Sequence, residues 1–257
     1  MLLHYVVEGD AGATPLLLVR GLGRSGRYWL RVREVLGGRL RLIVPDNIGV
    51  GRSPVPRPPY STRRMARDLV AVLDDAGLER VNVFGISLGG MIAQRLVIDH
   101  PGRVDRLVLG CTSPGGRWGP RLKLAGVLGI ARAMTLPRAR AARHMAPRLV
   151  SPAFLGEHPE VADEWARLAV EEPVTPRGLV GQISAALRHD ARRELAGVQT
   201  PTLVVTGDRD DMIHPSESRR IARTMPNARL VVLPGVGHDF PTEAPEETAR
   251  LLCEFLG

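Results

Sequence analysis

Three kinds of side chain that cooperate in nucleophilic catalysis stand directly after short apolar runs of this chain. They are Ser87, an aspartate among residues 208–211, and His238. A serine hydroxyl attacks a carbonyl carbon efficiently when an imidazole takes its proton and a carboxylate orients that imidazole. The residue types therefore predict acyl transfer through a serine, provided that the fold brings three distant segments together.

The serine stands at the centre of the segment Gly-Ile-Ser-Leu-Gly, between the apolar run 81–84 and apolar residues at helical spacing. A strand that turns directly into a helix through this pattern strains the serine backbone and exposes the hydroxyl. Glycines are expected at 85 and 89 because side chains there would collide where strand and helix pack closely. The amide of Leu88 would face an oxyanion from the first turn of the helix. The plainer alternative is a serine that only caps this helix.

The acid candidates follow the apolar run 201–205, in the segment Thr-Gly-Asp-Arg-Asp-Asp. The carboxyl ends of parallel strands meet at one edge of a sheet, so this segment should reach the edge that carries Ser87. The residues alone leave Asp208, Asp210 and Asp211 open as the acid.

The base candidate is His238, which follows the apolar run 230–233 in the segment Gly-Val-Gly-His. His214 is its rival, but it stands at the start of a helical pattern on another loop. Three further histidines fall in a region of helical patterns, where we expect solvated side chains: His144, His158 and His189.

The elements that would position these residues alternate along the chain. Six short apolar runs are expected to be strands buried on both faces, at 16–19, 40–44, 81–84, 107–109, 203–205 and 230–233. Four longer stretches have helical spacing, at 62–76, 88–98, 215–225 and 244–255. This alternation predicts a mostly parallel sheet flanked by helices, with an antiparallel edge strand near Val6.

The alternation stops after Cys111 and returns at Thr202. The stretch between them contains helical patterns such as 122–134, 159–170 and 178–188, punctuated by arginine and proline. We therefore expect a core domain formed by residues 1–113 and 199–257, with residues 114–198 as a helical cap inserted into it.

With these motifs the chain resembles the α/β-hydrolase fold family over essentially its whole length, and specifically the esterase and enol-lactonase branch. In that family the acid usually stands three residues after a glycine and five before a proline. Gly207, Asp210 and Pro215 match this spacing. The resemblance therefore implies a triad of Ser87, Asp210 and His238.

The resemblance also implies a second oxyanion donor on the loop after an early strand, typically His-Gly-x-Gly. This chain reads Arg20-Gly-Leu-Gly, so Arg20 replaces the histidine and the amide of Leu22 would be the donor. The segment 46–53 resembles another family loop but lacks its central arginine. We expect it to support the rim of the site rather than take part in the reaction.

The function expected from this resemblance is cofactor-independent and metal-independent hydrolysis of a small carboxylic ester or lactone through an acyl-enzyme. Acyl transfer to another alcohol and cofactor-free haloperoxidase activity use the same triad and stay open as alternatives. A ligand-binding protein on the hydrolase scaffold is the alternative from another class, because fold does not prove function.

The amino-acid composition argues against several other classes of protein. The 257 residues are 44% apolar and 24% charged, which is ordinary for a globular enzyme. The formal charge of +8 comes from scattered arginines with one lysine, Lys123, so we expect no nucleic-acid face. No run is long enough for a membrane span and the first residues do not resemble a secretion signal, so a cytoplasmic protein is expected. Cys111 and Cys253 match no metal or redox spacing, which favours buried thiols.

The excess of positive charge also leads to the hypothesis that arginines of the insertion attract an anionic substrate. The candidates are Arg117, Arg121 and Arg188.

Overall fold

The computed structural model describes residues 1–116 and 122–257. Its centre is a seven-stranded sheet in the order β1-β3-β2-β4-β5-β6-β7, in which β1 is antiparallel and the other strands are parallel. The strands are β1 (Tyr5–Glu8), β2 (Pro15–Val19), β3 (Arg41–Pro45), β4 (Val81–Ile86), β5 (Val104–Gly110), β6 (Thr202–Gly207) and β7 (Ala228–Leu233). The predicted parallel sheet with an antiparallel edge strand is confirmed.

The expectation that every strand is buried on both faces is wrong for β7. The central strands β4 and β6 are buried at every residue, whereas β7 is buried only at Leu233. The strand order explains this difference, because β7 forms the edge of the sheet opposite β1 and lacks a neighbour on one side.

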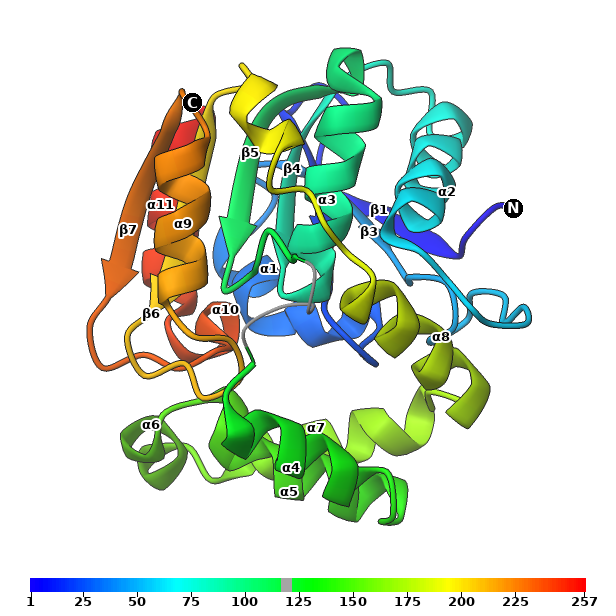
Figure 1. Cartoon of the computed structure of the whole chain (residues 1–257), viewed down its shortest axis with the longest axis vertical. Coiled ribbons are helices and arrows are strands. Elements are labelled where there is room, and N and C mark those ends of the chain that lie inside the picture. Colours follow the sequence, from blue (N-terminus) through cyan, green and yellow to red (C-terminus); the bar gives the residue numbers. More distant parts are fainter. Residues whose placement is uncertain (117–121) are drawn as a thin grey trace.

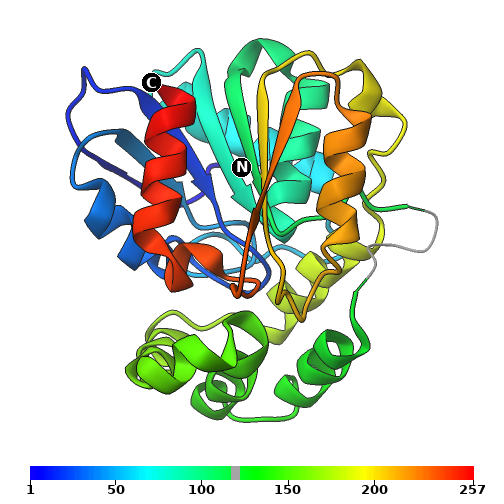
Figure 2. The same ribbon diagram turned by 90° about the vertical axis from the view of Figure 1, so that its left-hand side faces the viewer.

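Helices cover both faces of the sheet (Figures 1 and 2). One face carries α2 (Thr62–Asp75), α3 (Leu88–Asp99) and α9 (Ser216–Thr224), and the other carries α1 (Leu30–Leu36), α10 (Phe240–Glu243) and α11 (Pro245–Leu256). The predicted helices 62–76, 88–98, 215–225 and 244–255 are confirmed within two residues. Helices α1 and α10 were not predicted, because seven and four residues are too short to show a clear helical period.

Helices of the stretch between β5 and β6 gather at the end of the sheet to which the β5 and β7 arrowheads point (Figure 1). They are α4 (Leu124–Ala133), α5 (Arg138–Leu149), α6 (Pro152–Glu157), α7 (Glu160–Glu171) and α8 (Pro176–Leu187). Trp165, Val161 and Ala146 form a small core of their own, which Tyr28 joins from the sheet side. This second core fixes α5 and α7 above the strand ends.

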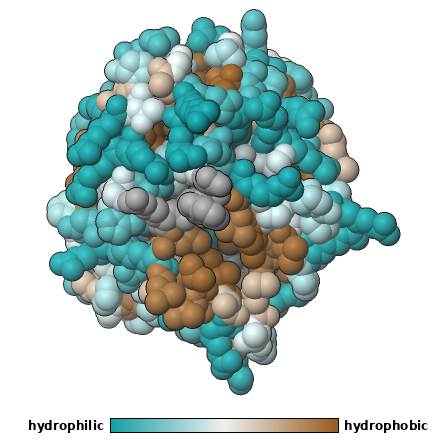
Figure 3. Space-filling view, in the orientation of Figure 1, coloured by the Kyte–Doolittle hydropathy of each residue, from teal (hydrophilic) through white to brown (hydrophobic). Residues whose placement is uncertain are grey.

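Helix α4 leaves apolar side chains uncovered. Leu124 and Leu128 are 72% and 59% exposed, and Figure 3 shows an apolar patch over this part of the molecule. None of the helices in the described part of the chain is long and apolar enough to cross a membrane.

Candidate active site

Ser87 occupies the sharp turn between β4 and α3, with φ 57° and ψ −121°. A non-glycine residue in this left-handed region is strained, and such strain is typical of functional sites. Two hydrogen bonds hold the turn: the Ser87 amide donates to the Gly110 carbonyl at 2.9 Å, and the Thr112 hydroxyl donates to the Ser87 carbonyl at 2.7 Å. The serine side chain makes no capping bond to α3, so the alternative of a simple helix cap is not what the structure shows.

The glycines that flank Ser87 allow the strand, the turn and the helix to approach closely. A Cβ atom on Gly85 would lie 2.4 Å from the Gly89 carbonyl oxygen, and one on Gly89 would lie 2.0 Å from the Val19 carbonyl oxygen. Both distances are far below van der Waals contact, so the prediction that side chains would collide at these two positions is confirmed.

Asp210 and His238 form a buried pair. His238 Nδ1 lies 2.8 Å from Asp210 Oδ2, and the two side chains are 6% and 0% exposed. The other carboxylate oxygen, Oδ1, accepts hydrogen bonds from the amides of Met212 and Ile213 at 2.7 and 2.9 Å. These bonds fix the carboxylate, and because Nδ1 contacts Asp210, Nε2 is the ring nitrogen that remains for another partner.

The competing acid and base residues are engaged elsewhere. Asp208 accepts from the Gly235 amide, and Asp211 pairs with Lys123 on the surface. His214 is exposed and its Nδ1 lies 2.8 Å from the Ser216 hydroxyl. Of the aspartates among residues 208–211, only Asp210 therefore contacts His238.

A third glycine joins the two loops that carry the pair. A Cβ atom on Gly207 would lie 2.1 Å from the Val236 carbonyl oxygen and 2.4 Å from that of Gly237. The loop of His238 also rests on the end of α5, because the Asp239 amide donates to the Leu149 carbonyl at 2.6 Å. The position of the histidine therefore depends on both the sheet and the helices above it.

The loop after β2 lies directly against the serine. A Cβ atom on Gly21 would lie 3.1 Å from Ser87 Cβ, and Leu22 lines the same cavity as Ser87. Asn47 donates to the Arg20 carbonyl at 2.8 Å, and the Gly23 amide donates to Gln182 of α8 at the same distance. The loop is therefore fixed on both sides of Leu22.

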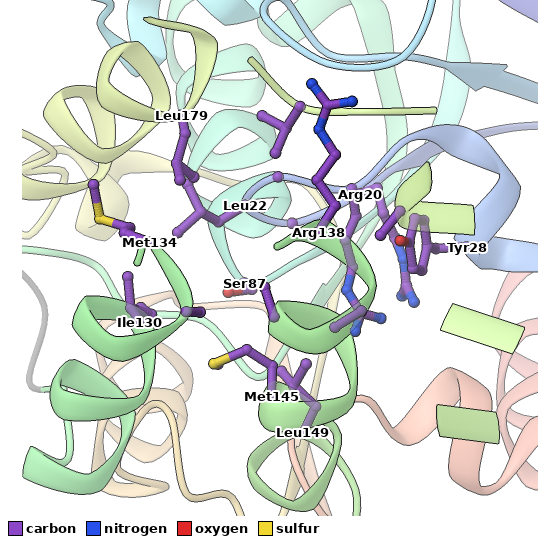
Figure 4. A pocket seen from close by; sticks show the side chains of 18 of the residues that line it. Arg20, Leu22, Tyr28, Ser87, Ile130, Met134, Arg138, Met145, Leu149 and Leu179 are labelled. Carbon is purple, nitrogen blue, oxygen red and sulfur yellow. The ribbon is translucent and has the colours of Figure 1, made fainter. Parts of the chain in front are cut away.

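The cavity above Ser87 has a volume of about 460 Å³ and lies between the strand ends and the helices α4, α5 and α8. Figure 4 shows Ser87 near its centre, with Ile130 and Met134 to one side and Tyr28 to the other. Its apolar lining consists of Leu22, Ile86, Ile130, Ala133, Met134, Leu136, Ala141, Ala142, Met145, Leu149, Val174, Leu179 and Met212, among others. His238 also lines this cavity, so the serine and the histidine face one space.

A buried ion-pair cluster forms the polar end of the cavity. Arg20 Nη2 and Arg24 Nη1 lie 2.8 and 2.6 Å from the same atom, Asp239 Oδ2. Burial acts to raise the pKa of Asp239, but the charges of the two arginines outweigh it and hold the pKa below its ordinary value. Arg20 thus supports the loop from the position where the resemblance led us to expect histidine.

Arg24, Asp239 and Tyr28 were not predicted from the sequence to line the site. The adjacency of Asp239 to His238 was an available signal, since a residue beside the base must lie near the reacting atoms. Nothing in the local pattern distinguishes Arg24 from the other arginines of this arginine-rich chain.

Of the arginines of the insertion that were expected to attract a substrate, only Arg188 belongs to the described residues. Arg188 is exposed at the end of α8 and does not line the cavity, while Arg117 and Arg121 lie outside the described residues. The insertion does contribute Arg138, at the start of α5.

His189 is buried, contrary to the expectation of a solvated side chain. It is 1% exposed, with Nδ1 at 3.0 Å from the Thr62 hydroxyl and Nε2 at 3.3 Å from Gln94 Oε1. Burial, helped by the charge of Arg95, lowers the pKa of His189 to about 3. The two side chains that hold this imidazole lie more than 90 residues away in sequence, so no local pattern could reveal its burial.

Among the described residues, one group offers three potential metal ligands: Cys111, Asp210 and His238, with ligand atoms within 4.8 Å of one another. Burial and the charge of Asp210 raise the pKa of the Cys111 thiol well above its ordinary value. A protonated thiol is a poor metal ligand, and Asp210 and His238 already bond each other. The three side chains are therefore better described as a hydrogen-bonded Asp210–His238 pair next to a neutral Cys111 thiol than as a set of metal ligands.

The burial expected for the two cysteines is found for Cys111 but not fully for Cys253, which is half-buried.

Comparison with known proteins gives a consistent set of relatives. A family model described as the alpha/beta hydrolase fold matches residues 14–245. The sequence is 33% identical to a putative carbamate hydrolase, RutD, from Caulobacter sp. (strain K31), covering 99% of this chain and 95% of the relative.

Two solved structures are similar over nearly the whole chain. The enol-lactonase from Burkholderia xenovorans LB400 has a TM-score of 0.87 and 25% identity, covering 99% of this chain and 96% of that one. A hydrolase from Pseudomonas aeruginosa PA01 has a TM-score of 0.85 and 29% identity, covering 98% of this chain and 93% of that one.

Proposed function

The chain belongs to the α/β-hydrolase fold family, and from that membership we propose that it is a serine hydrolase that cleaves a carboxylic ester or lactone through an acyl-enzyme. The observation that carries the proposal is the 2.8 Å contact between His238 Nδ1 and Asp210 Oδ2, beside a cavity that Ser87 and His238 both line.

In this mechanism His238 takes the proton of the Ser87 hydroxyl as the oxygen attacks the carbonyl carbon of the substrate. Asp210 fixes the imidazole in the tautomer whose Nε2 accepts that proton, and it stabilises the imidazolium that forms. His238 then gives the proton to the leaving alcohol. Water repeats the cycle on the acyl-enzyme and releases the acid. The burial of Asp210 and its bonds to two amides support this orienting role.

The negative charge on the carbonyl oxygen would be stabilised by the amides of Leu22 and Leu88. Leu88 is the first residue of α3, where amides have no partner within the helix. Leu22 stands on the loop that packs against Ser87. Each such donor contributes on the order of 3 kcal/mol to transition-state stabilisation in comparable sites.

Residues 114–198 would act as a cap on a core formed by residues 1–113 and 199–257. Helices α4, α5 and α8 supply much of the apolar cavity wall, so they would exclude water and select the substrate. The apolar lining favours a substrate with a compact, largely apolar acyl or alcohol part.

The test is hydrolysis of an aryl acetate and an aryl butyrate, together with a serine-directed organophosphonate. We expect steady turnover that Ser87→Ala abolishes and that stoichiometric labelling of Ser87 blocks. Tight binding of these compounds without turnover would instead identify a ligand-binding protein on this scaffold. Faster product formation when a second alcohol is added, with transfer of the acyl group to it, would identify an acyltransferase. Bromination of monochlorodimedone in the presence of peroxide, acetate and bromide would identify haloperoxidase activity.

Carbamate hydrolysis is a second candidate, favoured by the similarity to relatives named putative carbamate hydrolases over 96–99% of this chain. A carbamate carbonyl can be attacked by the same serine. A carbamate with the same aryl leaving group as the ester therefore belongs in the substrate panel, and a higher kcat/KM for the carbamate would decide in its favour.

A further inference from the structure

Arg24 is held rigidly at the wall of the cavity. Its guanidinium carbon lies 4.6 Å from the centre of the Tyr28 ring and 3.9 Å from that of Trp165, so two aromatic rings contact it. Nη1 bonds Asp239, and the side chain is 14% exposed although its neighbour Arg20 is 1% exposed. Arg24 is therefore the more accessible of the two arginines that line the cavity in this cluster.

The cluster carries excess positive charge. Arg20 and Arg24 share one carboxylate oxygen of Asp239, and no second carboxylate of the described chain lies within 4 Å of either guanidinium. Two cations and one anion leave a net charge of +1 in a largely buried place. Burial lowers the pKa of Arg24, which reflects the cost of keeping this charge away from water.

One further carboxylate lines the cavity. Glu172 makes no ion pair within 4 Å with Arg20 or Arg24; it accepts a hydrogen bond from Ser25 and lies 3.8 Å from Arg27. Two buried atoms of the cluster have no partner among the described residues: the donor Nε of Arg20 and the acceptor Oδ1 of Asp239. Each buried polar group without a partner costs on the order of 1–3 kcal/mol, which stability alone does not explain.

We propose that Arg24, held in place by Arg20 and Asp239, binds a carboxylate of the substrate, so that the preferred ester or lactone carries a negative charge near its reacting carbonyl. This inference rests on the proposed function and specifies its substrate class. Asp239 directly follows His238, which places the cluster next to the base rather than at the distant rim of the cavity. A planar guanidinium with fixed orientation is suited to carboxylate recognition.

The test compares matched ester pairs that differ in one charge. The first pair is 4-nitrophenyl hydrogen adipate and its methyl ester, with the charge on the acyl side. The second is 4-acetoxybenzoate and its methyl ester, with the charge on the alcohol side. For each protein the ratio of kcat/KM for the anionic and the neutral ester is measured, so that intrinsic reactivity cancels between variants.

In at least one pair, Arg24→Gln should lower this ratio by about 10- to 100-fold, which is the cost of a lost hydrogen bond to a charged group. Arg24→Lys should give an intermediate ratio, because it keeps the charge but loses the planar donor arrangement. Arg80→Gln is the control: Arg80 is exposed, pairs with Asp105 and does not line the cavity. It should leave both ratios unchanged.

Thermal melting of each variant shows whether a decrease in the ratio of kcat/KM values results from unfolding. Equal ratios in the parent and Arg24→Gln for both pairs would overturn the proposal. A ratio that falls in Arg138→Gln but not in Arg24→Gln would also overturn it, because the anion would then bind at the exposed start of α5.

A binding measurement separates this inference from the proposed function. Hexanoate and hexanamide are titrated calorimetrically into Ser87→Ala, and into the same protein carrying Arg24→Gln as well. Tighter binding of hexanoate that disappears with Arg24→Gln supports the carboxylate site even if no ester is hydrolysed. Equal binding of the two compounds contradicts the site even if neutral esters are hydrolysed well.

Discussion

Arg20 and Asp239 form a buried ion pair, with Nη2 and Oδ2 2.8 Å apart, across 219 residues of sequence. Arg20 begins the loop that carries the Leu22 amide, and Asp239 directly follows His238. The pair therefore ties the proposed oxyanion loop to the proposed base, and the Arg20 side chain also packs over Trp29 at 4.6 Å.

Breaking this pair should reduce both stability and activity. We expect Arg20→Ala to lower the free energy of unfolding by about 3 kcal/mol, the lower end for a buried pair, because Arg24 still compensates Asp239. Arg80→Ala is the control: this arginine is 53% exposed and pairs with Asp105, and its removal should cost less than about 1 kcal/mol. Urea unfolding measures both values, and equal costs would mean that the buried pair adds nothing.

The acid of the proposed triad can be identified by three amide substitutions. Asp210→Asn should reduce kcat by about 10⁴-fold with little loss of fold, because an amide no longer holds the imidazole in its active tautomer. Asp208→Asn and Asp211→Asn should retain kcat within a few-fold, since neither carboxylate contacts His238. A full-activity Asp210→Asn enzyme would exclude Asp210 as the acid.

Acid should weaken the fold through His189. The pKa of its imidazole is about 3 in the folded protein and near 6.5 in the unfolded chain, so above pH 6.5 the group is neutral in both states. Below pH 6.5 the unfolded chain binds the proton first, and the free energy of unfolding falls by about 1.4 kcal/mol per pH unit until the folded pKa is reached.

His189→Gln removes the titrating group and can keep a hydrogen bond to Thr62. Its free energy of unfolding, measured in urea at pH 7, 6 and 5, should fall less steeply than that of the parent. The same pH dependence in both proteins would show that His189 is not the group responsible.

Gly207 should not tolerate any side chain, because two loops pack closely against it. A methyl group there would lie 2.1 Å from the Val236 carbonyl oxygen, so Gly207→Ala must separate the loops of Asp210 and His238. We expect a loss of about 2–3 kcal/mol in unfolding free energy and a large loss of kcat. Gly197→Ala has nothing within 4 Å of the added carbon and should leave both unchanged, which a melting curve and an esterase assay will show.

The two cysteines should differ in reactivity. Cys111 is fully buried and burial raises the pKa of its thiol well above the ordinary value, so the nucleophilic thiolate is scarce. Iodoacetamide should therefore modify Cys253 alone in the native protein, and both cysteines after unfolding. Mass spectrometry of a Cys253→Ser variant checks this, since labelling of the folded variant would mean that Cys111 is accessible.

The sequence was sufficient for the sheet and for the contact between Asp210 and His238. Ser87, Asp210 and His238 each follow a strand, and the backbone of a parallel sheet brings strand ends together whatever the side chains do. The burial of His189 and the stacking of Arg24 between two rings depend on packing between distant helices. Local periodicity carries no information about such contacts.

The burial of strand β7 is a second property that the local sequence could not predict. Residues 230–232 of β7 are as apolar as those of a buried strand, but they are only half-buried because β7 has no neighbouring strand on one side. Strand order is a property of the whole topology, so the sequence of β7 could predict a strand but not its burial.

The hydrogen bond from the Asp239 amide to the Leu149 carbonyl ties the loop of His238, the proposed base, to helix α5 of the proposed cap. Grafting this region onto a related scaffold would transplant the support of His238 along with the substrate pocket. A chimera that keeps α5 through Leu149 and replaces only later residues of this region should hold His238 in place. A chimera that replaces α5 must recreate the backbone contact to the Asp239 amide in order to remain active.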